Sequence, residues 1–245
     1  MTVTATVLTV AIVFLGALTR ATFGFGEAVI SMPLLALLPI RLHTAVSLIG
    51  LAGLTIAVFA VATGWRHIDH RALAYLTATT ALGIPAGVAL ITLAPTAVVT
   101  AVLGVCLIAY GGYALARPAV ARLASTRWAL PFGFAAGALG SAYNFNGVPV
   151  AVYGTLAGWS PHRFRGTLQA HFLLSGAFVV AGQALGGLWT PHLFTLYALS
   201  LPALAVATIL GIVLHRRLPT EPFQRYVYVL IAALGVALLA VPDHL

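Results

Sequence analysis

Residues 23–29 read Phe-Gly-Phe-Gly-Glu-Ala-Val, and this short stretch interrupts an otherwise apolar part of the chain. Glu27 is one of only four acidic residues among 245, and two glycines stand close before it. Glycine and asparagine are the residues that best tolerate a positive φ, so Gly24 and Gly26 predict a point where one helix ends and another begins. The stretch therefore predicts a broken helix with a carboxylate at the start of its second part.

The surrounding sequence indicates that this break lies in a membrane. Apolar residues make up 61% of the chain and charged residues 7%, whereas soluble domains carry about 25% charged residues. A helix that crosses a bilayer needs about 20 apolar residues, and the longer charge-free runs hold two such helices each. These runs cover residues 1–19, 42–65, 72–116, 128–162 and 166–215. We expect one all-α integral membrane protein with the lipid bilayer as its partner.

The pattern of apolar residues predicts ten helical segments, of which 8–10 are transmembrane helices or half helices. The second and seventh are short, and we expect Pro33 and Pro149 to interrupt them. A helix of about 13 residues reaches only some 20 Å, which is less than a hydrocarbon core of about 30 Å. The segments are 3–19, 27–40, 43–63, 72–93, 96–116, 128–141, 147–158, 167–188, 192–214 and 224–241.

The arginines predict the orientation of these segments. The net charge of +8 comes from arginine alone, and its place in short loops favours a role in topology over binding to nucleic acid. If every segment crosses, Arg41 lies on one side and most other arginines lie on the opposite side. The positive-inside rule makes that second side cytoplasmic, with both termini outside. Its arginines are Arg66, Arg71, Arg117, Arg122, Arg127, Arg163, Arg165, Arg216, Arg217 and Arg225.

The two halves of the chain resemble each other. Residues 87–96 (GVALITLAPT) match residues 211–220 (GIVLHRRLPT), and a Pro-x-Arg element at Pro39 recurs at Pro161. Five segments per half is an odd number, so the second half is expected to be inverted relative to the first. Inverted repeats with broken helices are typical of transporters, whose substrate site lies where the broken helices meet. The predicted organisation is a first repeat at 1–117, a cytoplasmic linker at 118–127 and a second repeat at 128–245.

The sequence at each predicted break also resembles a known family. Residues 24–38 (GFGEAVISMPLLALL) and 137–154 (GALGSAYNFNGVPVAVYG) are similar to the duplicated glycine-rich motifs of TauE/SafE permeases, also called sulfite exporters. The usual second motif is richer in glycine, where this chain has Asn144 and Asn146. The resemblance implies a multi-pass protein of a bacterial inner membrane. It implies transport, often export, of sulfite, sulfonates, sulfoacetate-like compounds or related organosulfur anions.

The residues of the two motifs suit an anion. Each restarted helix offers free backbone N–H groups and the positive end of a helix dipole, and such an end binds anions. Asn144 and Asn146 can add amide donors, and Phe25 and Phe145 can pack on the substrate or gate it. The alternative is that these small and polar residues only allow a turn or close helix packing. Candidate binding residues are Arg20, Gly24, Phe25, Gly26, Glu27, Asn144, Phe145, Asn146, Gly147, Gln169 and His171.

Glu27 has three interpretations. It can occupy a helix start, where negative charge is favoured, or it can pair with Arg20, seven residues earlier. It can also carry a proton in alternation with an anionic substrate, because ionisable groups at membrane depth are often functional. Gly147 stands opposite Glu27 in the second half, so the carboxylate marks a difference between the halves.

Two further groups of polar residues have both a functional and a structural interpretation. Gln169 and His171 lie in an apolar segment, where they can line a substrate path or form hydrogen bonds between helices. His67, Asp69 and His70 resemble a metal cluster, but no further ligand follows at a spacing typical of zinc. We expect a solvated loop there, with no metal site and no cofactor.

These features favour a secondary transporter over other functions. The expected mechanism is alternating access, with export favoured because a negative cell interior drives anions outward. We expect no enzymatic activity, since neither a nucleophile with a base nor a metal cluster is evident. The alternatives are an accessory or sensor subunit in the membrane, or a permease for a different small anion. The sequence is compatible with a monomer and with a homodimer.

Overall fold

The structure of the protein is a computed structural model. It describes residues 3–64, 67–116, 123, 125–217, 228–229, 231–236 and 239–240. Within these ranges the chain is helical and forms no strand. The helices are α1 (Val3–Phe23), α2 (Glu27–Ala36), α3 (Leu42–Gly64), α4 (His70–Leu93), α5 (Thr96–Ala116), α6 (Ala129–Tyr143), α7 (Gly147–Leu156), α8 (Pro161–Leu185) and α9 (Pro191–Arg217), with a 3-10 turn, η2 (Thr126–Trp128), before α6. Helical residues at 228–229, 231–236 and 239–240 lie inside the tenth predicted segment.

The lengths of the helices separate spanning from non-spanning elements. Among the described residues, α1, α3, α4, α5, α8 and α9 are long and apolar enough to cross a membrane. The helices α2 and α7 have 10 residues each, which corresponds to about 15 Å at ~1.5 Å per residue. The prediction of an all-helical membrane protein with two short helices is therefore confirmed.

The prolines do not interrupt the short helices, so that prediction was wrong. Pro33 lies inside α2, which continues to Ala36. Pro149 is the third residue of α7, in the first turn, where proline removes no helical hydrogen bond. Both helices are short because a break precedes them and a turn follows them.

The start of α8 is the largest boundary error of the sequence analysis. The helix begins at Pro161, six residues before the predicted start at residue 167. Ser160 caps it, because its hydroxyl accepts from the Arg163 backbone N–H. Proline after a serine cap is a common helix start, since its fixed φ suits the first helical position.

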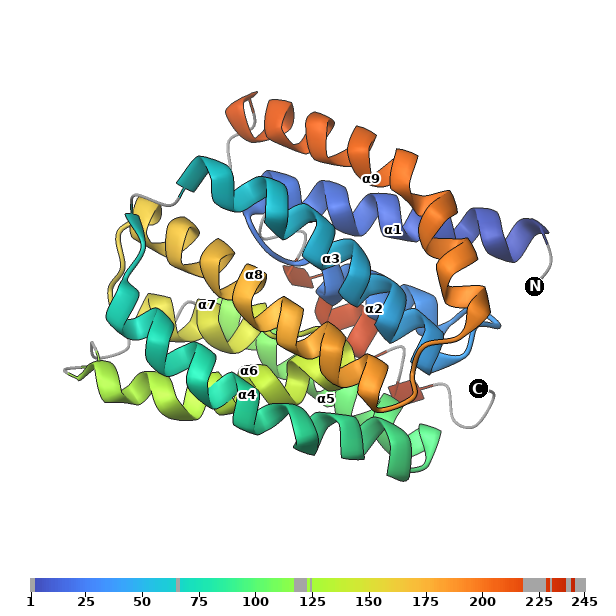
Figure 1. The fold of residues 1–245 in the computed structure, drawn as a ribbon, viewed down its shortest axis with the longest axis horizontal. Helices are drawn as coiled ribbons and strands as arrows, with labels where there is room; N and C mark the ends of the chain where they lie inside the picture. Colours follow the sequence, from blue (N-terminus) through green and yellow to red (C-terminus); the bar gives the residue numbers. More distant parts are fainter. Residues whose placement is uncertain are drawn as a thin grey trace.

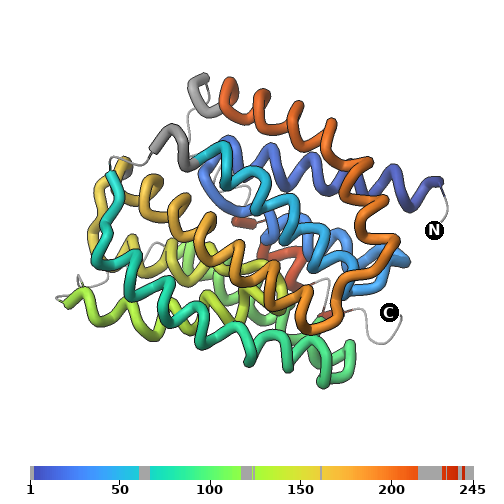
Figure 2. Tube along the Cα trace, viewed as in Figure 1, coloured from blue at the N-terminus to red at the C-terminus, as the bar shows by residue number. Residues whose placement is uncertain are grey.

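The packing of the helices follows the same scheme in both halves. α1 lies along α9, as α6 lies along α4, and α3 and α8 lie side by side between these pairs (Figure 1). Gly87 of α4 lies against Ala138 and Ser141 of α6, and its sequence match Gly211 of α9 lies against α1. Figure 2 shows the same arrangement along the trace. These matching contacts fit the two predicted repeats. The inverted orientation of the second repeat relative to the first stays a prediction.

Several predicted cytoplasmic loops meet at one end of the helices, at the left of Figure 1. Arg163 Nε lies 3.6 Å from Asp69 Oδ2, which joins the start of α8 to the segment before α4. The rings of His67 and His162 are 5.3 Å apart. The backbone of Leu123, in the predicted linker, donates to Leu156 at the end of α7. Arg66, Arg117, Arg122 and Arg225 lie outside the described residues, as do the side chains of Arg216 and Arg217.

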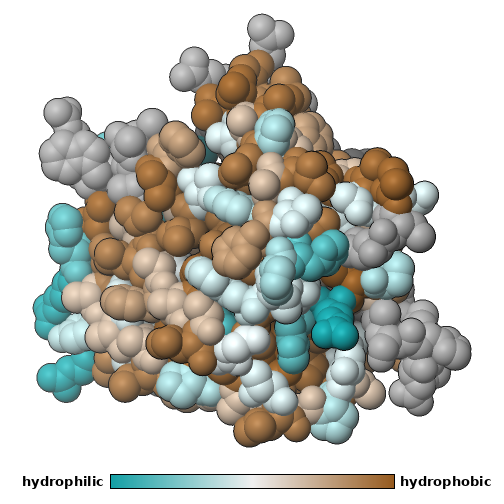
Figure 3. Space-filling model, turned by 45° about the vertical axis from the view of Figure 1, so that its right-hand side comes forward, coloured by the Kyte–Doolittle hydropathy of each residue, from teal (hydrophilic) through white to brown (hydrophobic). Residues whose placement is uncertain are grey.

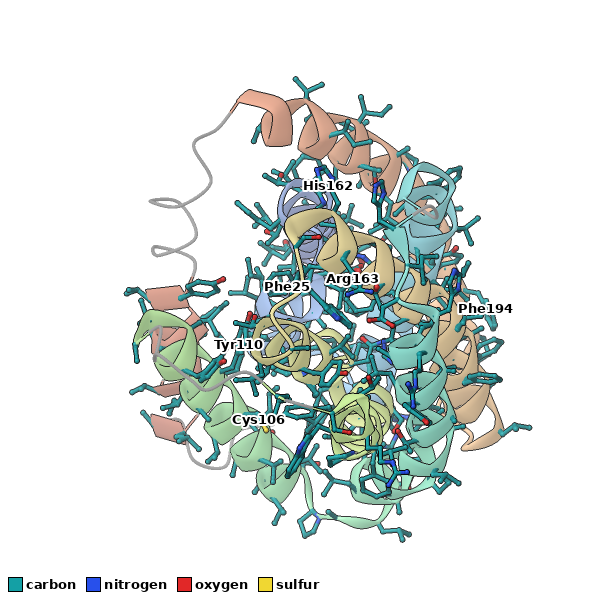
Figure 4. All side chains as sticks on the ribbon, turned by 90° about the vertical axis from the view of Figure 1, so that its left-hand side faces the viewer. Phe25, Cys106, Tyr110, His162, Arg163 and Phe194 are labelled. Carbon is teal, nitrogen blue, oxygen red and sulfur yellow. The ribbon has the colours of Figure 1, made fainter. Side chains whose placement is uncertain are left out.

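Apolar side chains cover much of the exterior, as Figure 3 shows for one face. Exposed examples include Phe59, Leu82, Leu185 and Ile209. In water such a surface would be unfavourable, whereas in lipid it is the expected exterior. Phe194 points away from the protein in Figure 4, in agreement with this arrangement.

Candidate functional site

Both motifs form helix breaks. Gly24 and Gly26 have φ values of 88° and 99°, and α2 begins directly after them at Glu27. Asn144 ends α6 in the left-handed region with φ 58°, and α7 begins at Gly147. Asn146 has an ordinary helical φ of −56°, so a single asparagine makes the second turn where two glycines make the first. The predicted breaks are present at both places.

The two breaks face a common cavity of about 40 Å³. A water molecule needs about 10–15 Å³ of such space, so the cavity holds about three water-sized groups. The predicted site residues that line it are Arg20, Phe25, Gly26, Glu27, Asn144, Phe145, Asn146 and Gly147, and α3 and α8 complete the wall. Residues about 120 positions apart in sequence therefore meet around one small space.

Arg20 supplies the positive charge in this wall. Its Nη1 donates to Glu27 Oε2 at 2.8 Å, and the two residues are only 6% and 4% exposed. Its guanidinium carbon lies 4.5 Å from the centre of the Phe172 ring, an arrangement that favours a cation. Nε and Nη2 have no hydrogen-bond partner within the described part of the chain. Arg20 is thus fixed on two sides, lines the cavity, and keeps two buried donors without a partner among the described residues.

The structure supports two of the three interpretations of Glu27. The carboxylate pairs with Arg20, and it also occupies the first position of α2. Gly53 of α3 leaves room for the Arg20–Glu27 pair because it has no side chain. A Cβ at this position would lie 2.9 Å from Arg20 Nη1 and 3.0 Å from Glu27 Oε2. The other carboxylate oxygen, Oε1, is buried without a partner among the described residues. A proton-carrying role stays a hypothesis.

Asn144 connects two helices across the cavity. Its side-chain nitrogen donates to the backbone oxygen of Val46 in α3. Its Oδ1 accepts from Gln183 Nε2 of α8 at 3.4 Å. One amide hydrogen and the carbonyl oxygen are therefore engaged, which gives this side chain a structural role alongside its place in the cavity wall.

Gln169 and His171 lie behind the cavity wall. Gln169 Nε2 donates to the Gly24 carbonyl at 2.7 Å and so fixes the first break to α8. His171 is fully buried, with Nε2 3.1 Å from Thr80 Oγ1 and Nδ1 3.3 Å from Ser175 Oγ. Asn146 of the cavity wall donates to the same Ser175 oxygen at 3.1 Å. Gln169 thus holds the first break directly, whereas His171 shares the Ser175 hydroxyl with Asn146 of the second break.

Phe172, Gly53 and Ser175 were missed by the sequence analysis. Phe172 contacts Arg20 from a helix in the other half of the chain, and no local pattern indicates such a contact. Gly50 and Gly53 of α3 are three residues apart and both line the cavity, so a small-residue stripe was a usable signal.

Asp69 caps α4 by accepting from the Ala72 N–H. Among the described residues, no group of His, Cys, Asp or Glu is arranged to hold a metal ion.

Comparison with known proteins identifies the family. The model of the family described as sulfite exporter TauE/SafE matches residues 8–238. The chain belongs to the TauE/SafE family. No curated protein and no solved structure matches it. As a TauE/SafE protein it is a multi-pass membrane transporter of the exporter type for sulfite or a related anion, in a family of transporters and not of enzymes.

Proposed function

We propose that this chain carries a small sulfur oxyanion, such as sulfite or an organic sulfonate, through the cavity between the two helix breaks. The observation that supports this most is Arg20, a residue of the cavity wall that is 6% exposed and has two buried donors without a partner among the described residues. Buried donors are rarely left unsatisfied, because each costs about 1–3 kcal/mol and a charged group costs more. A bound oxyanion would satisfy them.

The two half helices add to this attraction. The first N–H groups of a helix have no partner inside it, and residues of the first turn of both α2 and α7 line the cavity. Each helix start also carries about half a positive charge from the helix dipole. The size of the cavity, about three water-sized groups, suits a compact oxyanion in this conformation.

Alternating access is the proposed mechanism, because the cavity lies between elements of both halves. α4 and α6 are in backbone contact: a Cβ on Gly83 would lie 2.1 Å from the Phe134 oxygen, and one on Gly137 2.0 Å from the Thr80 oxygen. Such close packing favours movement of these helices as one body. The breaks at residues 24–26 and 144–146 are then the points where the halves change their contacts.

Export is the proposed direction, in a bacterial inner membrane with the arginine-rich loops in the cytoplasm and both termini outside. One charge that crosses 100 mV gains or loses about 2.3 kcal/mol. A negative interior therefore drives an anion outward without a coupling ion.

The test is transport and binding by purified protein in proteoliposomes. Vesicles that contain the protein and are loaded with sulfite or methanesulfonate should release the anion faster than protein-free vesicles of the same lipid with the same load. The double variant Arg20→Met with Glu27→Gln keeps the site neutral and should lose both binding and flux. Arg127→Met removes an exposed arginine at the predicted cytoplasmic end and should behave as the wild type.

Three outcomes contradict parts of the proposal. Protein that neither binds nor moves these anions contradicts it entirely. Binding without movement would favour a sensor or accessory subunit. Equal flux in the double variant and in Arg127→Met would remove Arg20 from the site.

A further inference from the structure

We propose that the site selects anions with a single negative charge and moves that charge across the membrane uncompensated, with Glu27 remaining on Arg20. This inference rests on the proposed function and specifies its substrate class and its energetics. It follows from the charges and the unpartnered hydrogen-bonding groups of the described residues that line the cavity.

The fixed charges of the site cancel before the substrate arrives. Arg20 and Glu27 are the charged residues among the described ones that line the cavity, and they form a pair at 2.8 Å. The two helix starts contribute about half a positive charge each. The site therefore offers about one positive charge in total, which a monovalent anion neutralises and a divalent anion exceeds.

The substrate does not have to displace Glu27. Glu27 is bound to Nη1, whereas Nε and Nη2 have no partner within the described ranges. Nε and Nη2 lie on one edge of the planar guanidinium, where two parallel N–H bonds can hold two oxygens of one oxyanion. Arg20 can thus bind Glu27 and an oxyanion at the same time, and the cycle needs no proton on Glu27.

The free oxygen of Glu27 also disfavours a second negative charge. Oε1 is buried, without a hydrogen-bond partner in the described structure, in a residue of the cavity wall. At 4 Å two like charges repel by about 4 kcal/mol at an effective dielectric constant of 20. An anion that brings a donor hydrogen, such as hydrogensulfite, can instead bind this oxygen.

The other titratable groups around Glu27 do not alter this balance. On α8, Arg165 Nε lies 3.8 Å from a Cβ built on Gly24. Neither Arg165 nor Gly24 lines the cavity. His171 has both ring nitrogens near hydroxyl groups. The ring centre of Tyr110 of α5 lies 6.4 Å from that of Phe25, and both residues are labelled in Figure 4. The described cavity residues of α3, α6 and α7 bring no charged side chain.

The first measurement uses the wild-type protein with methanesulfonate, whose single charge does not change near neutral pH. In proteoliposomes with an imposed potassium-diffusion potential, its equilibrium ratio should shift tenfold outward for about 60 mV of negative interior potential. A pH-sensitive dye should report no accompanying proton. A ratio independent of the potential, or one proton for each anion, would overturn the inference.

The second measurement concerns valence. Sulfate, which carries two charges, should compete at least tenfold more weakly than methanesulfonate for the wild-type protein. Glu27→Gln removes one negative charge and should raise the relative affinity for sulfate at least tenfold, whereas Glu27→Asp should keep the wild-type ratio. Equal competition by the two anions in the wild type would overturn the inference even if Glu27→Gln fails to fold.

These results separate the two proposals. Absence of any anion flux contradicts the proposed function itself. Flux of methanesulfonate with another charge stoichiometry, or without preference over sulfate, leaves that function intact and contradicts only the charge rule.

Discussion

The first and second helix breaks share a backbone plan but differ in chemistry. Each interrupts a helix, and each is followed by a ten-residue helix whose start lines the cavity. The first break carries Arg20 and Glu27, whereas Gly140 and Gly147 stand 120 positions later. The shared plan supplies helix dipoles from both sides, and the charged pair is present on one side only.

A packing constraint explains why the second break lacks the pair. A Cβ on Gly147 would lie 2.5 Å from Cζ of Phe172, and the same ring lies beneath Arg20. A Cβ on Gly140 would lie 2.9 Å from the Cβ of Asn146. The ring that supports the cation of the first break therefore occupies the space that a side chain on Gly147 would need. The difference between the halves is built into the packing.

The largest expected effect on stability comes from removing the positive member of the Arg20–Glu27 pair in the first break. Arg20→Met leaves Glu27 buried without its partner, and loss of one member of such a pair costs about 3–5 kcal/mol. The double variant with Glu27→Gln should recover most of this loss, because a neutral pair needs no counter-charge. Thermal unfolding in detergent measures both. Equal instability of the single and double variants would show that the charge itself is not the cause.

A smaller effect is expected from adding a side chain to the second break. Gly147→Ala places a methyl group against Phe172 and should lower the free energy of unfolding by about 1–3 kcal/mol. Gly112→Ala is the matched control, since a Cβ there meets no atom of the described residues within 4 Å. A Gly147→Ala protein as stable as the Gly112→Ala protein would remove the packing explanation for the asymmetry.

The asparagines of the second break should separate stability from binding. Asn146→Leu removes an amide from the cavity wall and should weaken methanesulfonate binding about tenfold or more, since hydrogen bonds to charged groups contribute about 1.5–3 kcal/mol. Asn144→Leu loses the contacts with Val46 and Gln183 and places a branched side chain at positive φ. We expect it to lower the melting temperature. Unchanged binding in Asn146→Leu would reduce the motif to a packing element.

The sequence predicted the breaks because their cause is local. Gly24, Gly26 and Asn144 adopt positive φ, which few other residues tolerate. The pairing of Arg20 with Glu27 was one of three interpretations, because a break between them leaves their distance undefined. The same limit applies to His171, whose position behind the wall depends on contacts with Thr80 and Ser175 in the folded chain. Tertiary contacts, such as that of Phe172, have no local signature.

The smallest expected effect tests whether the second break needs support from α8 as the first does. The first break is held by Gln169 on the Gly24 carbonyl, and Asn146 of the second donates to Ser175. Ser175→Ala removes that acceptor, so the amide of Asn146 loses its fixed orientation while staying in the wall. A neutral hydrogen bond contributes about 0.5–1.5 kcal/mol, so methanesulfonate affinity should fall about two- to tenfold. Ser200→Ala, whose hydroxyl donates to Leu196 within α9, should leave affinity unchanged. If both serine variants bind alike, Asn146 does not depend on α8, and the two breaks differ in support as well as in charge.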